Sequence, residues 1–190
     1  MSVRVIAGRA KGRRLETPDL PQMRPTTDRT KQILFDILAD APAGAMVLDL
    51  YAGSGSLGIE AWSRGAEGLV FVERDPVAAR AIRRNLRAVG AEGTVVVDSV
   101  EDFLERPGHT PADLAFLDPP YGPGLGSLPG VLRGLMTSGA IRRGAIVVVE
   151  SPEPIRWPDG LTEYRQRKVG GTTLSFTRHD GDHSDLSRDL

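Results

Sequence analysis

Residues 46–58 read MVLDLYAGSGSLG, a short apolar run followed by a glycine-rich turn. Gly53, Gly55 and Gly58 match the pattern G-x-G-x-x-G. Glycine lets the backbone turn sharply from a strand into a helix and approach a ligand closely. Many tight strand–helix turns also carry glycines, so the pattern alone predicts a βα unit and only favours a cofactor site.

Strand and helix patterns alternate on the C-terminal side of this turn. We expect strands at 46–50, 69–73, 94–97, 113–117 and 145–150, and a final hairpin of 162–168 with 172–178 across Gly170 and Gly171. Helices are expected between Thr27 and Pro42 and at 57–63, 76–89, 100–104 and 128–136. This alternation predicts a doubly wound α/β fold, in which helices cover both faces of a mostly parallel sheet. Residues 3–17 are expected to form a short hairpin or basic ribbon.

The chain has 190 residues and no cysteine, and this length is typical of one domain. The missing cysteines exclude disulfides, thiolate metal sites and a cysteine nucleophile. The longest aliphatic runs are far shorter than the roughly 20 residues of a membrane helix, and the first residues do not resemble a signal peptide. We therefore expect a cytoplasmic enzyme or binding protein with no membrane partner and no bound metal.

The formal net charge of −1 is distributed unevenly along the chain. Residues 1–31 carry eight basic and three acidic side chains, whereas the remainder is mildly acidic. A basic arm ahead of an acidic body indicates contact between the arm and a polyanion. The chain prefers arginine to lysine, which suits phosphates and base edges, although GC-rich coding produces the same bias.

Two carboxylates lie at the ends of the first two expected strands. Glu73 follows Gly53 by 20 residues, at the spacing at which a carboxylate accepts hydrogen bonds from a ribose. This combination fits either a nicotinamide dinucleotide or S-adenosylmethionine. Asp49 favours S-adenosylmethionine, because a carboxylate suits a cationic amino-acid end and would repel a pyrophosphate. A structural Asp49 that bonds the N–H groups of its own loop is the alternative.

Asp118-Pro119-Pro120-Tyr121 ends the fourth expected strand and is the most specific feature of the chain. Neither proline has an N–H, so the corner offers mainly acceptors. The Asp118 carboxylate and the Pro119 carbonyl could accept the two hydrogens of an amine attached to a flat ring. They would thereby stabilise the positive charge that develops as the nitrogen attacks a methyl group. Tyr121 could stack on the ring.

The motifs DLYAGSGSLGIEA, VERD and LDPPY together resemble class I S-adenosylmethionine-dependent methyltransferases of the (D/N)PP(Y/F) amino-methylating group. Residues 4–15, RVIAGRAKGRRL, and 24–29, RPTTDR, resemble the bacterial 16S ribosomal RNA guanine-N2 methyltransferases of the RsmD family. The resemblance covers about residues 3–178. It implies a Rossmann-like methyltransferase fold with a seven-stranded sheet. It also implies an enzyme that methylates the N2 amine of one guanine in 16S rRNA by direct in-line transfer.

The resemblance also implies roles for individual residues. Asp118, Pro119, Pro120 and Tyr121 would receive the target guanine as the catalytic corner. The expected contacts to the methionine end, the ribose and the adenine of S-adenosylmethionine come from Asp49, Gly53, Ser54, Gly55, Glu73, Arg74, Asp98, Ser99 and Val100. Val100 stands where a small residue would be expected, so the adenine contacts follow the family pattern least well.

The basic arm is expected to hold 16S rRNA or an assembling 30S subunit through salt-dependent phosphate contacts. The residues expected to bind RNA are Arg4, Arg9, Lys11, Arg13, Arg14 and Arg24. The segment 24–28 could instead close over the cofactor. We expect an RNA-binding extension at 1–25, a methyltransferase domain at 26–178, a polar tail at 179–190, and a monomer.

Several alternatives remain at this point. The Asp118 corner would also fit adenine N6 or cytosine N4, in RNA or in DNA. The glycine turn would also fit a nicotinamide-dependent oxidoreductase. The basic arm would also fit an RNA-binding module without catalytic activity.

Overall fold

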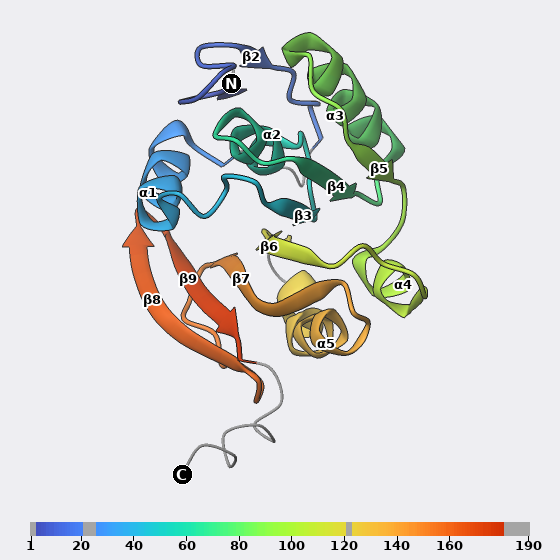
Figure 1. Ribbon diagram of the computed structural model, residues 1–190, viewed down its shortest axis with the longest axis vertical. Coiled ribbons are helices and arrows are strands. Elements are labelled where there is room, and N and C mark those ends of the chain that lie inside the picture. The colour runs from blue at the N-terminus through green and yellow to red at the C-terminus, as the bar shows by residue number, and fades with distance from the viewer. Residues whose placement is uncertain (1–2, 21–25, 121–122, 181–190) are drawn as a thin grey trace.

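The computed structural model describes residues 3–20, 26–120 and 123–180. Its centre is a seven-stranded sheet in the order β5-β4-β3-β6-β7-β9-β8, beside a separate two-stranded sheet, β1-β2 (Figure 1). The strands are β1 (Val3–Arg4), β2 (Arg14–Leu15), β3 (Met46–Leu50), β4 (Gly68–Val72), β5 (Thr94–Val96), β6 (Ala112–Leu117), β7 (Ile141–Ser151), β8 (Leu161–Val169) and β9 (Thr172–His179). The helices are α1 (Asp28–Leu38), α2 (Ser56–Ser63), α3 (Pro76–Val89), α4 (Val100–Glu105) and α5 (Pro123–Thr137).

Strands β5, β4, β3, β6 and β7 are parallel, and β9 then runs antiparallel to both β7 and β8. The chain proceeds from β3 to β4 on one side and later returns to β6 on the other side of β3. The strand order therefore switches at β3 and β6. In an open α/β sheet a ligand binds beyond the carboxyl ends of the strands at such a switch point.

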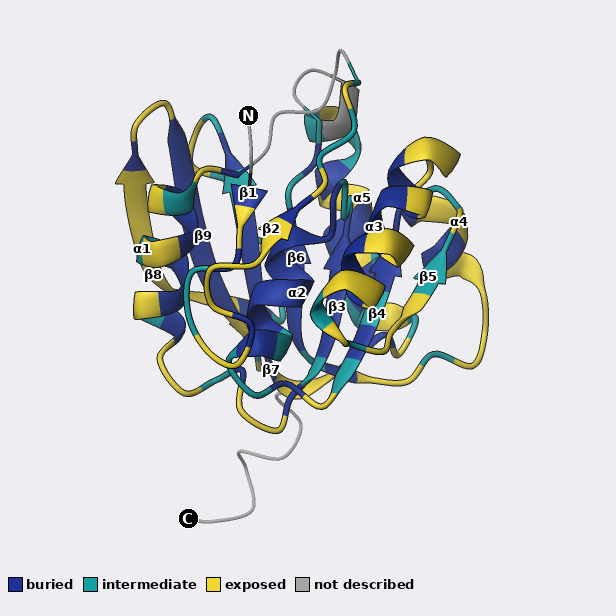
Figure 2. Ribbon diagram, turned by 90° about the horizontal axis from the view of Figure 1, so that it is seen from above, coloured by how far each residue is buried: buried dark blue, intermediate teal, exposed yellow. Residues whose placement is uncertain are grey.

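Side chains on the two faces of the sheet form two apolar layers. One layer joins α1, α2, α3 and the β1–β2 hairpin to sheet residues such as Phe71, Phe116 and Val148. The other joins α4 and α5 to residues such as Leu117 and Val149. Figure 2 shows buried central strands, exposed residues on the outer faces of α1 and α3, and a largely buried α2. The predicted doubly wound α/β fold, with its C-terminal antiparallel hairpin, is confirmed.

Helix α5 begins at Pro123 and is therefore longer than the helix at 128–136 that the sequence predicts. It also contains Pro129. Glycines and Pro129 disfavour helix, but Leu128, Leu132 and Leu135 are buried in the layer beneath. Packing of this apolar face outweighs the weak local propensity. Strand β7 likewise starts at Ile141 rather than 145, and β9 includes His179, which was expected to start the polar tail.

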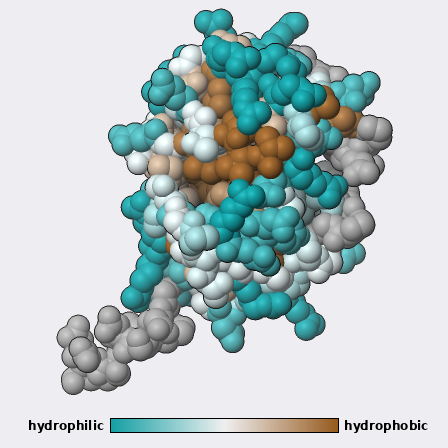
Figure 3. All heavy atoms as spheres, turned by 90° about the vertical axis from the view of Figure 1, so that its right-hand side faces the viewer, coloured by the Kyte–Doolittle hydropathy of each residue, from teal (hydrophilic) through white to brown (hydrophobic). Residues whose placement is uncertain are grey.

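Strand β5 forms one edge of the sheet and has no fully buried residue. The side of the molecule that carries β5 and α4 shows an apolar area surrounded by hydrophilic residues (Figure 3). Three residues is a short edge strand, which limits pairing with other chains. In the described part of the chain, no helix is long and apolar enough to cross a membrane.

Candidate active site

The turn after β3 brings Asp49 against the start of α2. Asp49 is buried, and its Oδ2 accepts a hydrogen bond from the Gly58 N–H at 2.9 Å. A Cβ on Gly58 would lie 2.4 Å from the Phe71 ring and 3.2 Å from Asp49 Oδ2, so only glycine fits. Tyr51, directly after β3, has φ of 60°, a strained conformation that is typical of functional sites when a non-glycine residue adopts it.

The pKa of Asp49 is raised to about 7, mainly by burial; the Gly58 N–H lowers it and the charge of Glu73 raises it within this net value. Asp49 is therefore only partly ionised near neutral pH in the free protein. An ammonium group placed beside it would favour the ionised form. The bond to Gly58 also shows that Asp49 has a structural role in its own loop, so the two interpretations of this residue are compatible.

Glu73 follows β4 and is bonded on both oxygens. Oε2 accepts the Gly53 N–H and Oε1 accepts the Asp75 N–H, each at 2.8 Å. The carboxylate thus fixes the glycine turn next to the start of α3. Since each carboxylate oxygen can accept a second hydrogen bond, Glu73 keeps acceptor capacity for the hydroxyl groups of a ribose.

The residues expected near adenine follow β5. Ser99 is the N-cap of α4 and accepts the Asp102 N–H, while Asp98 accepts the Ser99 N–H and is paired with Arg106. Val100 is buried in the layer of α4 and α5. These contacts give all three residues structural roles at the expected edge of the site. Arg74, which follows Glu73 directly, is exposed.

The corner after β6 brings Asp118 beside two further polar residues. The Thr26 hydroxyl, just before α1, donates to Asp118 Oδ2 at 3.4 Å. The pKa of Asp118 is raised well above its ordinary value, mainly by burial and then by the charges of Glu150 and Asp49. Pro119 is buried and Pro120 half-buried, whereas Tyr121 lies outside the described residues. The sequence pattern marked neither Thr26 nor Glu150 as a site residue.

The basic arm presents its cations in two ways. Arg4 is paired with Asp28, and Arg9 stacks 4.3 Å over the Trp62 ring and donates to the Trp62 and Ala66 carbonyls. Both therefore have partners within the protein. Lys11, Arg13 and Arg14 are exposed, and no ion pair involves them in the described ranges. Arg24 lies outside the described residues.

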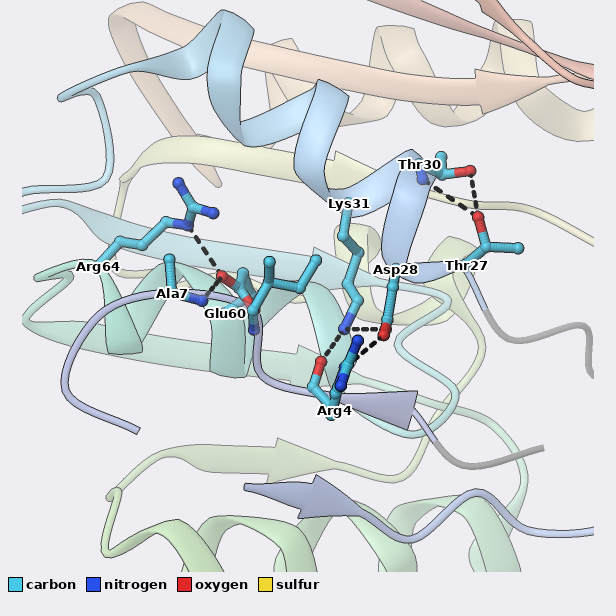
Figure 4. A network of polar contacts seen from close by, with 9 residues as sticks. Arg4, Ala7, Thr27, Asp28, Thr30, Lys31, Glu60 and Arg64 are labelled. Atoms are coloured by element: carbon cyan, nitrogen blue, oxygen red, sulfur yellow. Dashed lines mark hydrogen bonds and ion pairs between the residues drawn. The ribbon is translucent and has the colours of Figure 1, made fainter. Parts of the chain in front are cut away.

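Two buried charged side chains attach the arm to the body (Figure 4). Lys31, from α1, donates to the Arg4 carbonyl at 2.5 Å. Glu60, from α2, accepts the Ile6 N–H at 2.7 Å and the Ala7 N–H at 3.0 Å. Burial lowers the pKa of Lys31, while the charges of Glu60 and Asp28 oppose that change. Nothing in the sequence marks either residue, because their partners are backbone groups far away in the chain.

Asn85 connects the end of the arm to the cofactor turn. Its amide donates to the Glu16 carbonyl and to the Ser54 carbonyl, each at 2.9 Å, and its Oδ1 accepts the Glu16 N–H. Arg84 adds an ion pair with Glu16. A signal for Asn85 was present in the sequence, since it is a polar residue next to Leu86 and three positions after Ile82 on the apolar face of a predicted helix.

Solved structures with the same architecture define the class of protein. The structure of yhhF from Escherichia coli aligns with a TM-score of 0.85 and 31% identity, over 96% of this chain and 100% of that chain. Precorrin-6y C5,15-methyltransferase from Geobacter metallireducens aligns with a TM-score of 0.64 at 18% identity, over 87% and 94%, and shows the fold alone. Sheet order and glycine turn are those of a class I methyltransferase.

The sequence comparisons then narrow this class to one family. The family model "Conserved hypothetical protein 95" matches residues 3–178. Ribosomal RNA small subunit methyltransferase D of Escherichia coli (strain K12) is 40% identical over 150 residues, which cover 78% of this chain and 74% of that protein. The chain therefore belongs to the ribosomal RNA small subunit methyltransferase D family, as the resemblance of its motifs predicted.

Proposed function

We propose that this protein transfers a methyl group from S-adenosylmethionine to the exocyclic N2 amine of one guanine in small-subunit rRNA. Methyl transfer from this cofactor to rRNA follows from membership of the family. Guanine N2 as the target and direct in-line transfer are the finer part of the proposal. The resemblance of residues 4–15 and 24–29 to the guanine-N2 methyltransferases supports guanine as the target. The half-buried Asp118 at an acceptor-rich corner, at the switch point of the sheet, supports direct transfer to an amine.

The residues around the glycine turn fit the cofactor. Asp49 is buried and only partly ionised, which suits the ammonium of an amino-acid end, and Glu73 keeps free lone pairs for a ribose. The close approach at Gly58 leaves room for backbone but not for another side chain. Bound S-adenosylmethionine supplies the electrophilic methyl group. Asp98, Ser99, Val100 and Arg74 remain expected contacts at the edge of this site.

The acceptor corner would act on the amine of the base. A ring amine is a weak nucleophile, because its lone pair is delocalised into the ring. The Asp118 carboxyl and the Pro119 carbonyl would accept its two hydrogens and turn the lone pair toward the methyl group. Pre-oriented acceptors in a site with little water stabilise the positive charge that develops on the nitrogen. Asp118, whose pKa is raised by burial, is then suited to receive the proton that leaves after transfer.

The exposed cations of the arm would hold the RNA. Lys11, Arg13 and Arg14 have no ion-pair partner in the part of the chain that the structure describes. Phosphate contacts by such side chains give affinity that falls as salt rises. Tyr121 and Arg24 keep their predicted roles in base stacking and RNA binding.

One labelling experiment tests the proposal. The protein is incubated with radioactive S-adenosylmethionine and either unmodified small subunits or naked rRNA, and the labelled nucleotide is mapped and identified as a nucleoside. N2-methylguanine at one position supports the proposal, and a labelled adenine or cytosine contradicts it. Calorimetry with S-adenosylhomocysteine and with NAD serves as the control for the oxidoreductase alternative, which requires tight binding of NAD alone.

A further inference from the structure

Glu150 places a second carboxyl group beside the catalytic corner. Strands β6 and β7 are parallel neighbours, and their register pairs Leu117 with Val149. Asp118 and Glu150 are each one residue further along: Asp118 directly follows β6, and Glu150 is the penultimate residue of β7, so the two lie at the same level of the sheet. Since neighbouring strands lie about 4.8 Å apart, the two carboxyl groups start from adjacent positions at the same edge of the sheet.

Both carboxyl groups also belong to the same face of the sheet. Side chains alternate between the faces of a strand. Phe116 and Val148, two residues before Asp118 and Glu150, belong to the layer under α1, α2 and α3. Leu117 and Val149 belong to the opposite layer. The hydrogen bond from Thr26, next to α1, agrees with this assignment for Asp118.

Glu150 has an oxygen that the protein leaves unsatisfied. Its Oε2 is withdrawn from solvent, and no residue among those described donates a hydrogen bond to it. Burial raises the pKa of Glu150, with partial opposition from the Thr172 hydroxyl, and the charge of Glu150 raises the pKa of Asp118. Buried acceptors are nearly always paired in native proteins. The Oε2 atom therefore has the capacity to accept a hydrogen bond from a bound substrate.

The three bases with a methylatable amine differ in the atom next to that amine. In guanine, N2 stands beside N1–H, which is a donor. In adenine and cytosine, the amine stands beside an unprotonated ring nitrogen, which is an acceptor. An ionised carboxylate only accepts hydrogen bonds, so in its ionised form a second carboxylate beside the amine-binding group is complementary to guanine and not to adenine or cytosine.

We propose that Glu150 selects guanine, because its Oε2 accepts the N1–H of the base whose N2 amine is held by Asp118. This inference rests on the proposed function and adds the residue that determines its base specificity. Guanine supplies donors to both carboxyl groups at once. Adenine or cytosine would instead place a nitrogen lone pair against the Glu150 oxygen, and the buried acceptor would stay unpaired.

The first test uses wild-type protein and two guanine analogues, each ligated into rRNA at the mapped nucleotide. 6-Thioguanine keeps both N1–H and the N2 amine, whereas 2-aminopurine keeps the amine but has no hydrogen on N1. We expect kcat/KM for 6-thioguanine to stay within about 10-fold of guanine. For 2-aminopurine it should fall by roughly 100-fold or more, since a site built to bond an N–H rejects an analogue that lacks it. Equal rates on guanine and 2-aminopurine would overturn the inference without any variant.

The second test uses Glu150→Gln, whose amide can donate to the bare N1 of 2-aminopurine. We expect kcat/KM for guanine to fall by about 10- to 100-fold, as for the loss of one charged hydrogen bond. The value for 2-aminopurine should hold or rise, so that the preference for guanine collapses. Glu153→Gln, at an exposed glutamate three residues further on, is the matched control and should keep the preference.

The outcomes separate this inference from the proposed function. If Glu150→Gln lowers kcat/KM for guanine and for 2-aminopurine by the same factor, Glu150 has only a structural role and the inference is wrong. Guanine N2 methylation is then unaffected by this result. If wild-type protein methylates a base other than guanine, the proposed function fails and the inference fails with it. If Glu150→Gln does not fold, the analogue series on wild-type protein decides.

Discussion

Replacing Asp49 with asparagine should stabilise the free protein at neutral and higher pH. Burial raises the pKa of Asp49 from 3.8 to about 7, whereas the same carboxyl in the unfolded chain titrates normally. The folded state therefore holds this proton more tightly. The stability that the protonated group contributes is complete below about pH 4 and is lost as pH rises through 7. Asparagine keeps an oxygen for the Gly58 N–H and has no charge to lose.

The size of the effect follows from the shift. About 3 pKa units at 1.36 kcal/mol each correspond to about 4 kcal/mol, which is an upper value for the advantage of Asp49→Asn at pH 8. The advantage should shrink steadily toward zero at pH 4. Affinity for S-adenosylhomocysteine should move in the opposite direction, with a loss of roughly 10- to 100-fold, because a charged hydrogen bond to the ammonium is removed.

Urea unfolding of wild-type protein and Asp49→Asn at several values from pH 4 to pH 8 measures this difference directly. The measured difference includes a contribution from Asp118, because the charge of Asp49 raises the pKa of Asp118; this contribution has the same sign. Asp40→Asn, at an exposed aspartate, is the control and should follow wild-type protein at every pH. A stability difference that does not change between pH 4 and pH 8 would refute the reasoning.

Three further predictions concern the corner, the turn and the arm. Asp118→Ala should leave S-adenosylhomocysteine binding nearly intact by calorimetry and abolish methyl transfer; near-normal turnover would contradict its role. Gly58→Ala should lower the free energy of unfolding by about 1–3 kcal/mol, because the added Cβ overpacks against Phe71. Gly130→Ala, where a Cβ meets nothing within 4 Å, should instead be neutral or stabilising. Replacing Lys11, Arg13 and Arg14 together with glutamine should weaken rRNA binding and reduce its salt dependence. The control Arg80→Gln, on α3, should change neither.

Local patterns in the sequence were sufficient to predict the sheet and the positions of its strand ends. Apolar runs such as 46–50 alternate with helical spacing, and Gly53, Asp75 and Gly90 mark where elements start or stop. The site residues at strand ends follow from this alternation alone, because parallel strands end at one edge. The start of α5 could not be predicted, since burial of Leu128 and Leu132 outweighs its glycines and Pro129.

Contacts between distant residues could not be predicted from such patterns. Glu60 bonds the N–H groups of Ile6 and Ala7, which are 54 and 53 residues away in the chain. A backbone N–H leaves no trace in the side-chain sequence, so nothing identifies this partner. Glu150 was missed for a related reason. A polar residue near the end of an apolar strand is common, so Glu150 does not stand out in the sequence. Only the register between β6 and β7 brings it beside Asp118.

The attachment of the arm also has a consequence for the order in which the chain folds. Ser63, which accepts the Ala10 N–H and donates to the Ala7 carbonyl, is made more than 50 residues after these two partners. Gly8 is equally dependent on α2, because a Cβ there would lie 1.8 Å from the Ser63 carbonyl oxygen. The segment from β1 to Ala10 is thus made before its partner and docks only once α2 has formed.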